Sequence, residues 1–214
     1  MIDLPPPGFR ALDPQLPVAI HRRHLPHWRQ QGATYFVTFR LADSLPAERL
    51  LELREDRERW QREHLEPSSE EMDAQSRQHM EKVERWLDQG YGSCVLRRHD
   101  IAAIVEARLR HFEGTEYTLF SAAIMPNHAH VCVKPQGEHV LDDIVQAWKS
   151  VSAHMIGRAL KRKGQVWQDE SFDRIVRDTP HLRRVVRYIE ANPEKAGVTA
   201  RCWTTGLWNE WLGR

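Results

Sequence analysis

Hydrophobic and polar positions alternate strictly in the segment 34–41 (Thr-Tyr-Phe-Val-Thr-Phe-Arg-Leu). Side chains of a β-strand repeat with a period of two, so the pattern predicts a strand with one apolar face. That face would carry Tyr35, Val37, Phe39 and Leu41. The segments 117–125 and 129–134 are also predicted as strands, separated by Pro126 and Asn127, and 165–176 as a short extended stretch.

A helical period of 3.6 residues marks the remaining regions. The segments 45–64 and 69–89 are rich in charge and predict a helical hairpin. Asp100 is expected to cap a helix that ends near Gly114, and Thr179 is expected to cap a last helix that begins at Pro180. Between them a long helix is predicted from 141, with Met155 facing inward. Its outward cations would be Lys149, Arg158, Lys161, Arg162 and Lys163.

The order of these elements predicts an α+β fold. We expect a ferredoxin-like (RRM-like) antiparallel sheet with helices packed on one face, plus the inserted helical hairpin. Residues 1–214 would form a single domain. Its appendages would be an extended N-terminal arm (1–30), the hairpin (45–89) and a Trp-rich C-terminal tail (203–214).

Composition excludes some classes of protein. No run of 18 apolar residues exists, so no membrane partner is expected, and the proline-rich N-terminus does not resemble a signal peptide. Three scattered cysteines fit a cytoplasmic location. The net charge of +1 is uneven: residues 41–100 hold 15 Asp or Glu against 10 Lys or Arg, whereas residues 144–201 hold 12 basic against 6 acidic residues. Such clustering is a solvated face or a footprint for phosphates.

The candidate chemistry begins with His128 and His130. In a strand both imidazoles leave the same face, as two ligands of one metal ion require. On the pattern alone, two histidines this close among 12 are more often a chance pair than a metal site.

In the last helix, Arg184, Tyr188 and Asn192 are spaced four residues apart and share a surface row beside the buried stripe. Tyr188 is therefore either an amphipathic residue at the core edge or part of a polar site. Pro193 predicts that the helix ends at Asn192.

Three blocks of the sequence resemble one known family. These blocks are Met125-Pro-Asn-His-Ala-His130, Val166-Trp-Gln-Asp-Glu-Ser-Phe172 and Arg187-Tyr-Ile-Glu-Ala-Asn-Pro-Glu-Lys-Ala-Gly197. In this order and spacing they are similar to the signature blocks of the single-tyrosine HUH transposases, in particular the REP-associated tyrosine transposases. The resemblance extends over about residues 20–200 and is thinnest across the helical hairpin.

The resemblance implies a metal-dependent endonuclease and strand transferase that cuts single-stranded DNA at REP-like hairpins through a 5′-phosphotyrosine intermediate. It implies Tyr188 as the nucleophile and His128, His130 and Asn192 as ligands of Mg²⁺ or Mn²⁺. Lys149, Arg158, Lys161 and Arg184 are expected to bind DNA, and a homodimer is possible. No nucleotide cofactor is expected, because the chain lacks a P-loop. The alternatives are a non-cleaving protein that binds DNA or RNA hairpins and, more distantly, a hydrolytic metalloenzyme of another kind.

Overall fold

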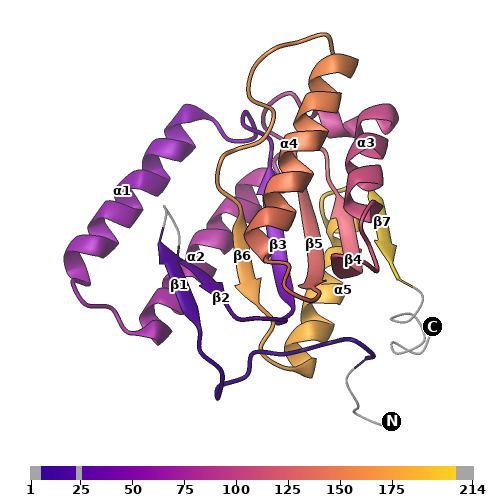
Figure 1. The fold of residues 1–214 in the computed structure, drawn as a ribbon. Helices are drawn as coiled ribbons and strands as arrows, with labels where there is room; N and C mark the ends of the chain where they lie inside the picture. Colours follow the sequence, from indigo (N-terminus) through magenta and orange to yellow (C-terminus); the bar gives the residue numbers. More distant parts are fainter. Residues whose placement is uncertain (1–5, 23–25, 206–214) are drawn as a thin grey trace.

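A five-stranded antiparallel sheet forms the centre of the protein (Figure 1). The computed structural model describes residues 6–22 and 26–205. Neighbouring strands follow the order β6-β3-β5-β4-β7, and every pair is antiparallel. The strands are β3 (Tyr35–Arg40), β4 (Tyr117–Ile124), β5 (His128–Pro135), β6 (Phe172–Ile175) and β7 (Arg201–Thr204).

The chain follows the ferredoxin-like βαββαβ order, which confirms the predicted fold class. Leaving out the hairpin and β7, the sequence of elements is β3, α3, β4, β5, α4, β6, and the four strands lie in the spatial order 4-1-3-2. The edge strand β7 was not predicted. The helices are α1 (Ala47–Glu63), α2 (Ser69–Leu87), α3 (His99–Arg110), α4 (Leu141–Ala159) and α5 (Thr179–Lys195), with a 3₁₀-helix η1 (Val95–Arg97) before α3.

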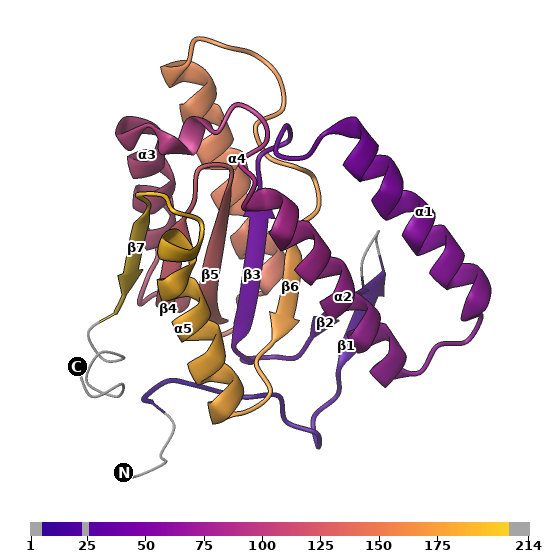
Figure 2. The same ribbon diagram turned by 180° about the vertical axis from the view of Figure 1, so that it is seen from behind.

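Helices cover both faces of the sheet, and not one face as expected. Helices α3 and α4 bury the apolar face of β3, where Tyr35, Val37 and Phe39 meet Trp148. On the opposite face, Phe36 and Cys132 pack against the buried stripe of α5. Both faces of β3 and β5 carry apolar side chains, so each face requires a cover. Figures 1 and 2 show α4 and α5 on opposite sides of the strands.

The inserted hairpin is formed by α1 and α2 and lies on the α5 side of the sheet (Figure 2). Ser68 caps α2 by accepting from the backbone N–H of Glu71, whose carboxylate accepts in return from Ser68. Leu45, Val83, Trp86 and Leu87 form a small separate core. None of the described residues of α1 is buried, because α1 is the outer helix of the pair.

Two helix starts differ from the expectation. Asp100 lies inside the first turn of α3, where it pairs with Arg98, and the N-cap position belongs to Arg98. Asp178, not Thr179, caps α5 by accepting from the backbone N–H of His181. Asp and Thr are both good caps, so adjacent candidates are not separated by residue type alone. Met155 is 44% exposed and does not face inward.

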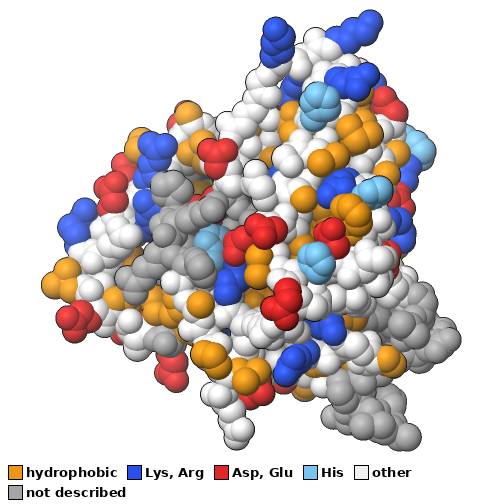
Figure 3. Space-filling model, in the orientation of Figure 1, with side chains coloured by type: hydrophobic (Ala, Val, Ile, Leu, Met, Phe, Trp, Pro, Cys, Tyr) orange, Lys and Arg blue, Asp and Glu red, His pale blue; other side chains and the backbone are white. Residues whose placement is uncertain are grey.

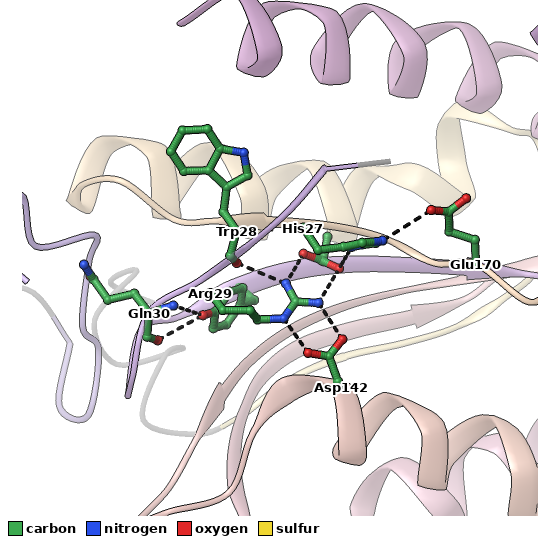
Figure 4. Close-up of polar contacts among 8 residues, drawn as sticks. His27, Trp28, Arg29, Gln30, Asp142 and Glu170 are labelled. Atoms are coloured by element: carbon green, nitrogen blue, oxygen red, sulfur yellow. Dashed lines mark hydrogen bonds and ion pairs between the residues drawn. The ribbon is translucent and has the colours of Figure 1, made fainter. Parts of the chain in front are cut away.

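A buried ionic network ties the N-terminal segment to the sheet edge (Figure 4). Strands β1 (Ala19–Arg22) and β2 (Pro26–Arg29) form a two-stranded sheet within the region predicted as an extended arm. His27 Nδ1 lies 2.6 Å from Asp173 Oδ2, and His27 Nε2 lies 3.3 Å from Glu170. Arg29 bridges Asp173 and Asp142. The network therefore joins β2, β6 and the start of α4.

Candidate functional site

His128 and His130 lie at the start of β5 and project toward the α5 side of the sheet. Both side chains are fully buried, and their Nε2 atoms are 3.0 Å apart. The outer nitrogen of each ring is held in place: His128 Nδ1 lies 2.8 Å from Asn127 Oδ1, and His130 Nδ1 lies 2.8 Å from Thr38 Oγ1. The two inner nitrogens therefore converge on one point, and the strand period predicts this placement.

The tautomer of His128 follows from its neighbour Asn127. The Asn127 amide nitrogen donates to the backbone carbonyls of Leu87 and Tyr91, so the amide oxygen is the atom that faces His128. His128 Nδ1 must then carry the proton, and its Nε2 presents a lone pair. Burial lowers the pKa of His128 to about 3, and burial together with His128 lowers that of His130. Both rings are neutral at pH 7, which is the form that binds metals.

Tyr188 of α5 lies beside this pair. Its ring centroid is 5.3 Å from that of His130 and 5.8 Å from that of Phe36. Burial, reinforced by Glu84 and Asp88, raises the pKa of the Tyr188 phenol, while the Asn192 side chain opposes the rise. Lys195 Nζ lies 5.4 Å from the ring centroid. A helix nearly 60 residues further along the chain thus brings a tyrosine ring against the histidine pair, within a single chain.

Asn192 lies one helical turn after Tyr188 and is buried. Its Oδ1 has no hydrogen-bond partner among the described residues. The expectation that the helix ends at Asn192 is wrong, because α5 continues through Pro193 to Lys195. Proline leaves the carbonyl four residues earlier without its helical donor, and that carbonyl, of Ile189, accepts from the thiol of Cys202 on β7 at 3.6 Å. The carbonyl that the proline leaves free thus has a partner on β7, and Asn192 lies within the helix.

The residues present fit a divalent cation. Two nitrogens about 2.1 Å from one ion and at a right angle to each other lie about 3.0 Å apart, which is the separation found between the two Nε2 atoms. The unpartnered oxygen of Asn192 supplies a third donor of the appropriate kind. The described part of the chain contains no group of three or more His, Cys, Asp or Glu side chains that could hold a metal. A ligand set would therefore consist of two imidazoles and one amide, all neutral.

A cleft of about 640 Å³ leads away from Tyr188 between α2 and α5. Arg184 lines it and is exposed, whereas Phe36 and Phe172 form its apolar floor. Sequence reasoning missed several of its residues. These are Glu84 and Arg77 on α2, Arg174 on β6 and Arg177 just after it. They come from segments whose pattern predicted only structure, and no sequence signal showed that the hairpin lies against α5.

The cations predicted on α4 are not assembled with Tyr188. Lys149 is buried and its Nζ donates to the backbone carbonyl of Asp169 at 2.6 Å, so the expectation that it faces outward is wrong. Its long side chain reaches back over the sheet edge instead of extending to solvent. Arg158 and Lys161 are exposed at the C-terminal end of α4, on the face of the sheet opposite α5. In Figure 3, basic side chains on that face are interspersed with acidic and apolar ones.

The comparison with protein families gives one match. Residues 91–192 match the model described as "Transposase IS200 like". The matched range contains His128, His130, Tyr188 and Asn192. Helices α1 and α2 precede the matched range, so Glu84 and Arg77 lie outside it.

Two solved structures are similar to this chain. The REP-associated tyrosine transposase bound to a REP hairpin shares 16% identity at a TM-score of 0.45, over 84% of this chain and 74% of that chain. A crystal structure of a proposed transposase from Deinococcus radiodurans R1 shares 15% identity at a TM-score of 0.39, over 74% and 89%. A comparison with curated protein sequences finds no match. Within the described residues no helix is long and apolar enough to cross a membrane.

Proposed function

We propose that this chain is a metal-dependent endonuclease and strand transferase that cuts single-stranded DNA at REP-like hairpins through a covalent 5′-phosphotyrosine on Tyr188. One observation carries the proposal. The Nε2 atoms of two buried neutral histidines lie 3.0 Å apart, the Tyr188 ring lies 5.3 Å from that of His130, and the buried Asn192 oxygen, one helical turn after Tyr188, has no partner among the described residues, although these residues come from segments far apart in the chain. A structural role alone would not require the Asn192 oxygen to be buried without a partner.

His128, His130 and Asn192 would hold the cation, Mg²⁺ or Mn²⁺, with imidazole ligands favouring Mn²⁺. A bound divalent ion withdraws charge from the phosphate oxygens and so makes phosphorus open to attack. The other residues of the chain orient the ligands and move the proton. Asn127 and Thr38 orient the two rings, as groups behind metal ligands commonly do.

Tyr188 must lose its proton as its oxygen attacks phosphorus. Glu84 is the carboxylate that faces the phenol, and burial raises its own pKa to about 7, so it can accept the proton near neutral pH. The new bond joins the phenol oxygen to phosphorus while the bond to the 3′-oxygen of the other fragment breaks, and that oxygen takes a proton from water and leaves as a 3′-hydroxyl. Lys195 lies over the ring and stabilises the developing phenolate. A second 3′-hydroxyl can reverse the exchange: it releases its proton to water as its oxygen attacks phosphorus, the bond from phosphorus to the phenol oxygen breaks, and the phenol regains its proton from Glu84.

The test is an adduct assay. The protein is incubated with Mn²⁺ and a hairpin oligonucleotide that has unpaired flanks and a label on its 3′ fragment. We expect a denaturation-resistant adduct that maps to Tyr188 by mass spectrometry, is absent in Tyr188→Phe and persists in the control Tyr91→Phe. If Tyr188→Phe forms as much adduct as the wild type, or if the wild type forms none on any such hairpin, the proposal fails.

One observation favours a second candidate, a hairpin-binding protein that does not cut. Burial and Glu84 raise the pKa of Tyr188, so the phenol keeps its proton in the arrangement described. This candidate predicts that hairpin affinity survives both metal chelation and Tyr188→Phe while no adduct forms under any condition.

A further inference from the structure

The cleft beside Tyr188 is walled by two helices that run in the same direction. Asp73 and Arg77 of α2 lie near Arg177 at the start of α5, and Glu84 of α2 lies near Tyr188 further along α5. In Figure 2 the two helices flank strands β3 and β6. The cleft therefore has a basic end and an end at the nucleophile.

Three arginines converge on one carboxylate at the basic end. Asp73 Oδ2 lies 3.2 Å from Arg77, 3.3 Å from Arg174 and 2.7 Å from Arg177. Asp73 is buried, whereas Arg77 and Arg177 are almost half exposed. The three guanidiniums come from α2, from β6 and from the segment before α5. One carboxylate thus gathers cations from three elements and neutralises the charge of only one of them.

The charge that remains acts on the neighbouring groups. The pKa of Arg174 is lowered, mainly because the side chain is buried. Repulsion from three neighbouring cations, Arg177, Arg77 and Arg184, lowers it further, and the attraction of Asp73 only partly opposes this. The Nε of Arg174 is buried without a hydrogen-bond partner among the described residues. Partly exposed guanidiniums that outnumber their carboxylate, next to an open cleft, are a site for an anion with several oxygens.

Acidic residues restrict where such an anion can lie. Glu81 and Glu84 continue the α2 row that begins at Arg77, and both line the cleft toward Tyr188. Phosphates are thus favoured at the arginine end and disfavoured along the acidic wall. The apolar floor of Phe36 and Phe172 lies between and offers aromatic surface to an unpaired base.

We propose that the cleft between α2 and α5 holds the single-stranded DNA flank of the hairpin, with its phosphates on Arg77, Arg174 and Arg177, and that Asp73 positions these three guanidiniums. The inference rests on the proposed function, because it supplies the path by which a strand reaches Tyr188. It assigns the inserted hairpin, outside the family match, to substrate binding. It also moves the main phosphate contacts away from α4.

The test measures affinity without cleavage. In a Tyr188→Phe background, anisotropy of a labelled hairpin with an unpaired flank is recorded between about 50 and 200 mM salt. We expect the pair Arg77→Ala and Arg177→Ala to lower affinity about tenfold and to reduce the salt slope by about 0.7 for each phosphate that the protein no longer neutralises. The control pair Arg158→Ala and Lys161→Ala removes the same charge from α4 and should change affinity less than about twofold.

Asp73→Asn gives a result of opposite sign for the two possible roles of Asp73. If Asp73 only neutralises charge, removing it should raise DNA affinity. If Asp73 positions the arginines, affinity should fall severalfold although the net charge becomes more positive, with the fold checked by circular dichroism. A rise in affinity in Asp73→Asn, or an α4 pair that weakens binding as much as the cleft pair, overturns the inference.

Failure of this inference is distinguishable from failure of the proposed function. If the protein with Tyr188 intact forms the adduct but the cleft variants bind the oligonucleotide normally, the cleft assignment alone is wrong. If no adduct forms with Tyr188 intact, the proposed function itself is wrong.

Discussion

Replacing His27 should change the pH dependence of stability by an amount that the structure allows to be worked out. Burial opposes protonation of His27, but hydrogen bonds to Asp173 and Glu170 outweigh it and raise its pKa from 6.5 to about 9. At about 1.4 kcal/mol for each pH unit, protonated His27 contributes about 3 kcal/mol to the free energy of unfolding. A raised pKa means that this contribution is fully present below pH 6.5 and is lost as the pH rises through about 9.

The network holds Asp173 of β6, and its neighbours in that strand, Phe172 and Arg174, line the cleft, so replacing His27 also tests how the cleft is supported. The free energy of unfolding is measured by urea denaturation at about pH 6 and about pH 10 for the wild type and for His27→Gln, which cannot take up the proton. The difference in free energy of unfolding between the wild type and His27→Gln should be about 3 kcal/mol smaller at about pH 10 than at about pH 6. His154→Gln, at an exposed position, is the control for the substitution itself. A wild-type to His27→Gln difference that is the same at both pH values would refute the reasoning.

Three further predictions concern the site and the core. Asn192→Leu should abolish the thermal shift that Mn²⁺ produces while leaving the metal-free protein as stable or about 1–2 kcal/mol more stable, since an unpartnered buried oxygen is removed; a loss of stability in calorimetry would contradict this. Thr38→Val removes the hydroxyl that holds His130 and should weaken Mn²⁺ binding about 10–100-fold by titration, so unchanged binding would exclude a positioning role. Trp148→Ala should cost about 3–5 kcal/mol of unfolding free energy and Met155→Ala less than about 1, a contrast that equal midpoints in urea would disprove.

Local patterns predicted the elements well where one physical rule dominated. The alternation at 34–41 corresponds to β3, and the apolar stripe that includes Val83 and Trp86 corresponds to the buried side of α2. The errors occurred where two rules competed. Asp178 and Thr179 are both good caps, and Pro193 was expected to end a helix that continues to Lys195, where the freed carbonyl of Ile189 accepts from Cys202.

For the candidate site too, some placements were predicted from the sequence and others were not. The sequence predicted that His128 and His130 share a face, because a strand has a period of two, and that Tyr188 and Asn192 share a row, because a helix has a period of 3.6. The predicted outward placement of Lys149 was wrong, because the helical period gives a direction but not the groups that the side chain meets.

By itself the sequence determined the ferredoxin-like order of strands and helices, the match of residues 91–192 to the IS200-like transposase model and the spacing of the candidate site residues. Only the tertiary structure decided that α5 covers the face carrying the histidines, that α2 brings Glu84 to Tyr188 and that Asp73 gathers three arginines. The physical reason is the distance along the chain over which each kind of interaction acts. Periodicity and capping act between neighbours in the chain, whereas charge, burial and hydrogen bonding act between whatever side chains the packing of distant elements brings together.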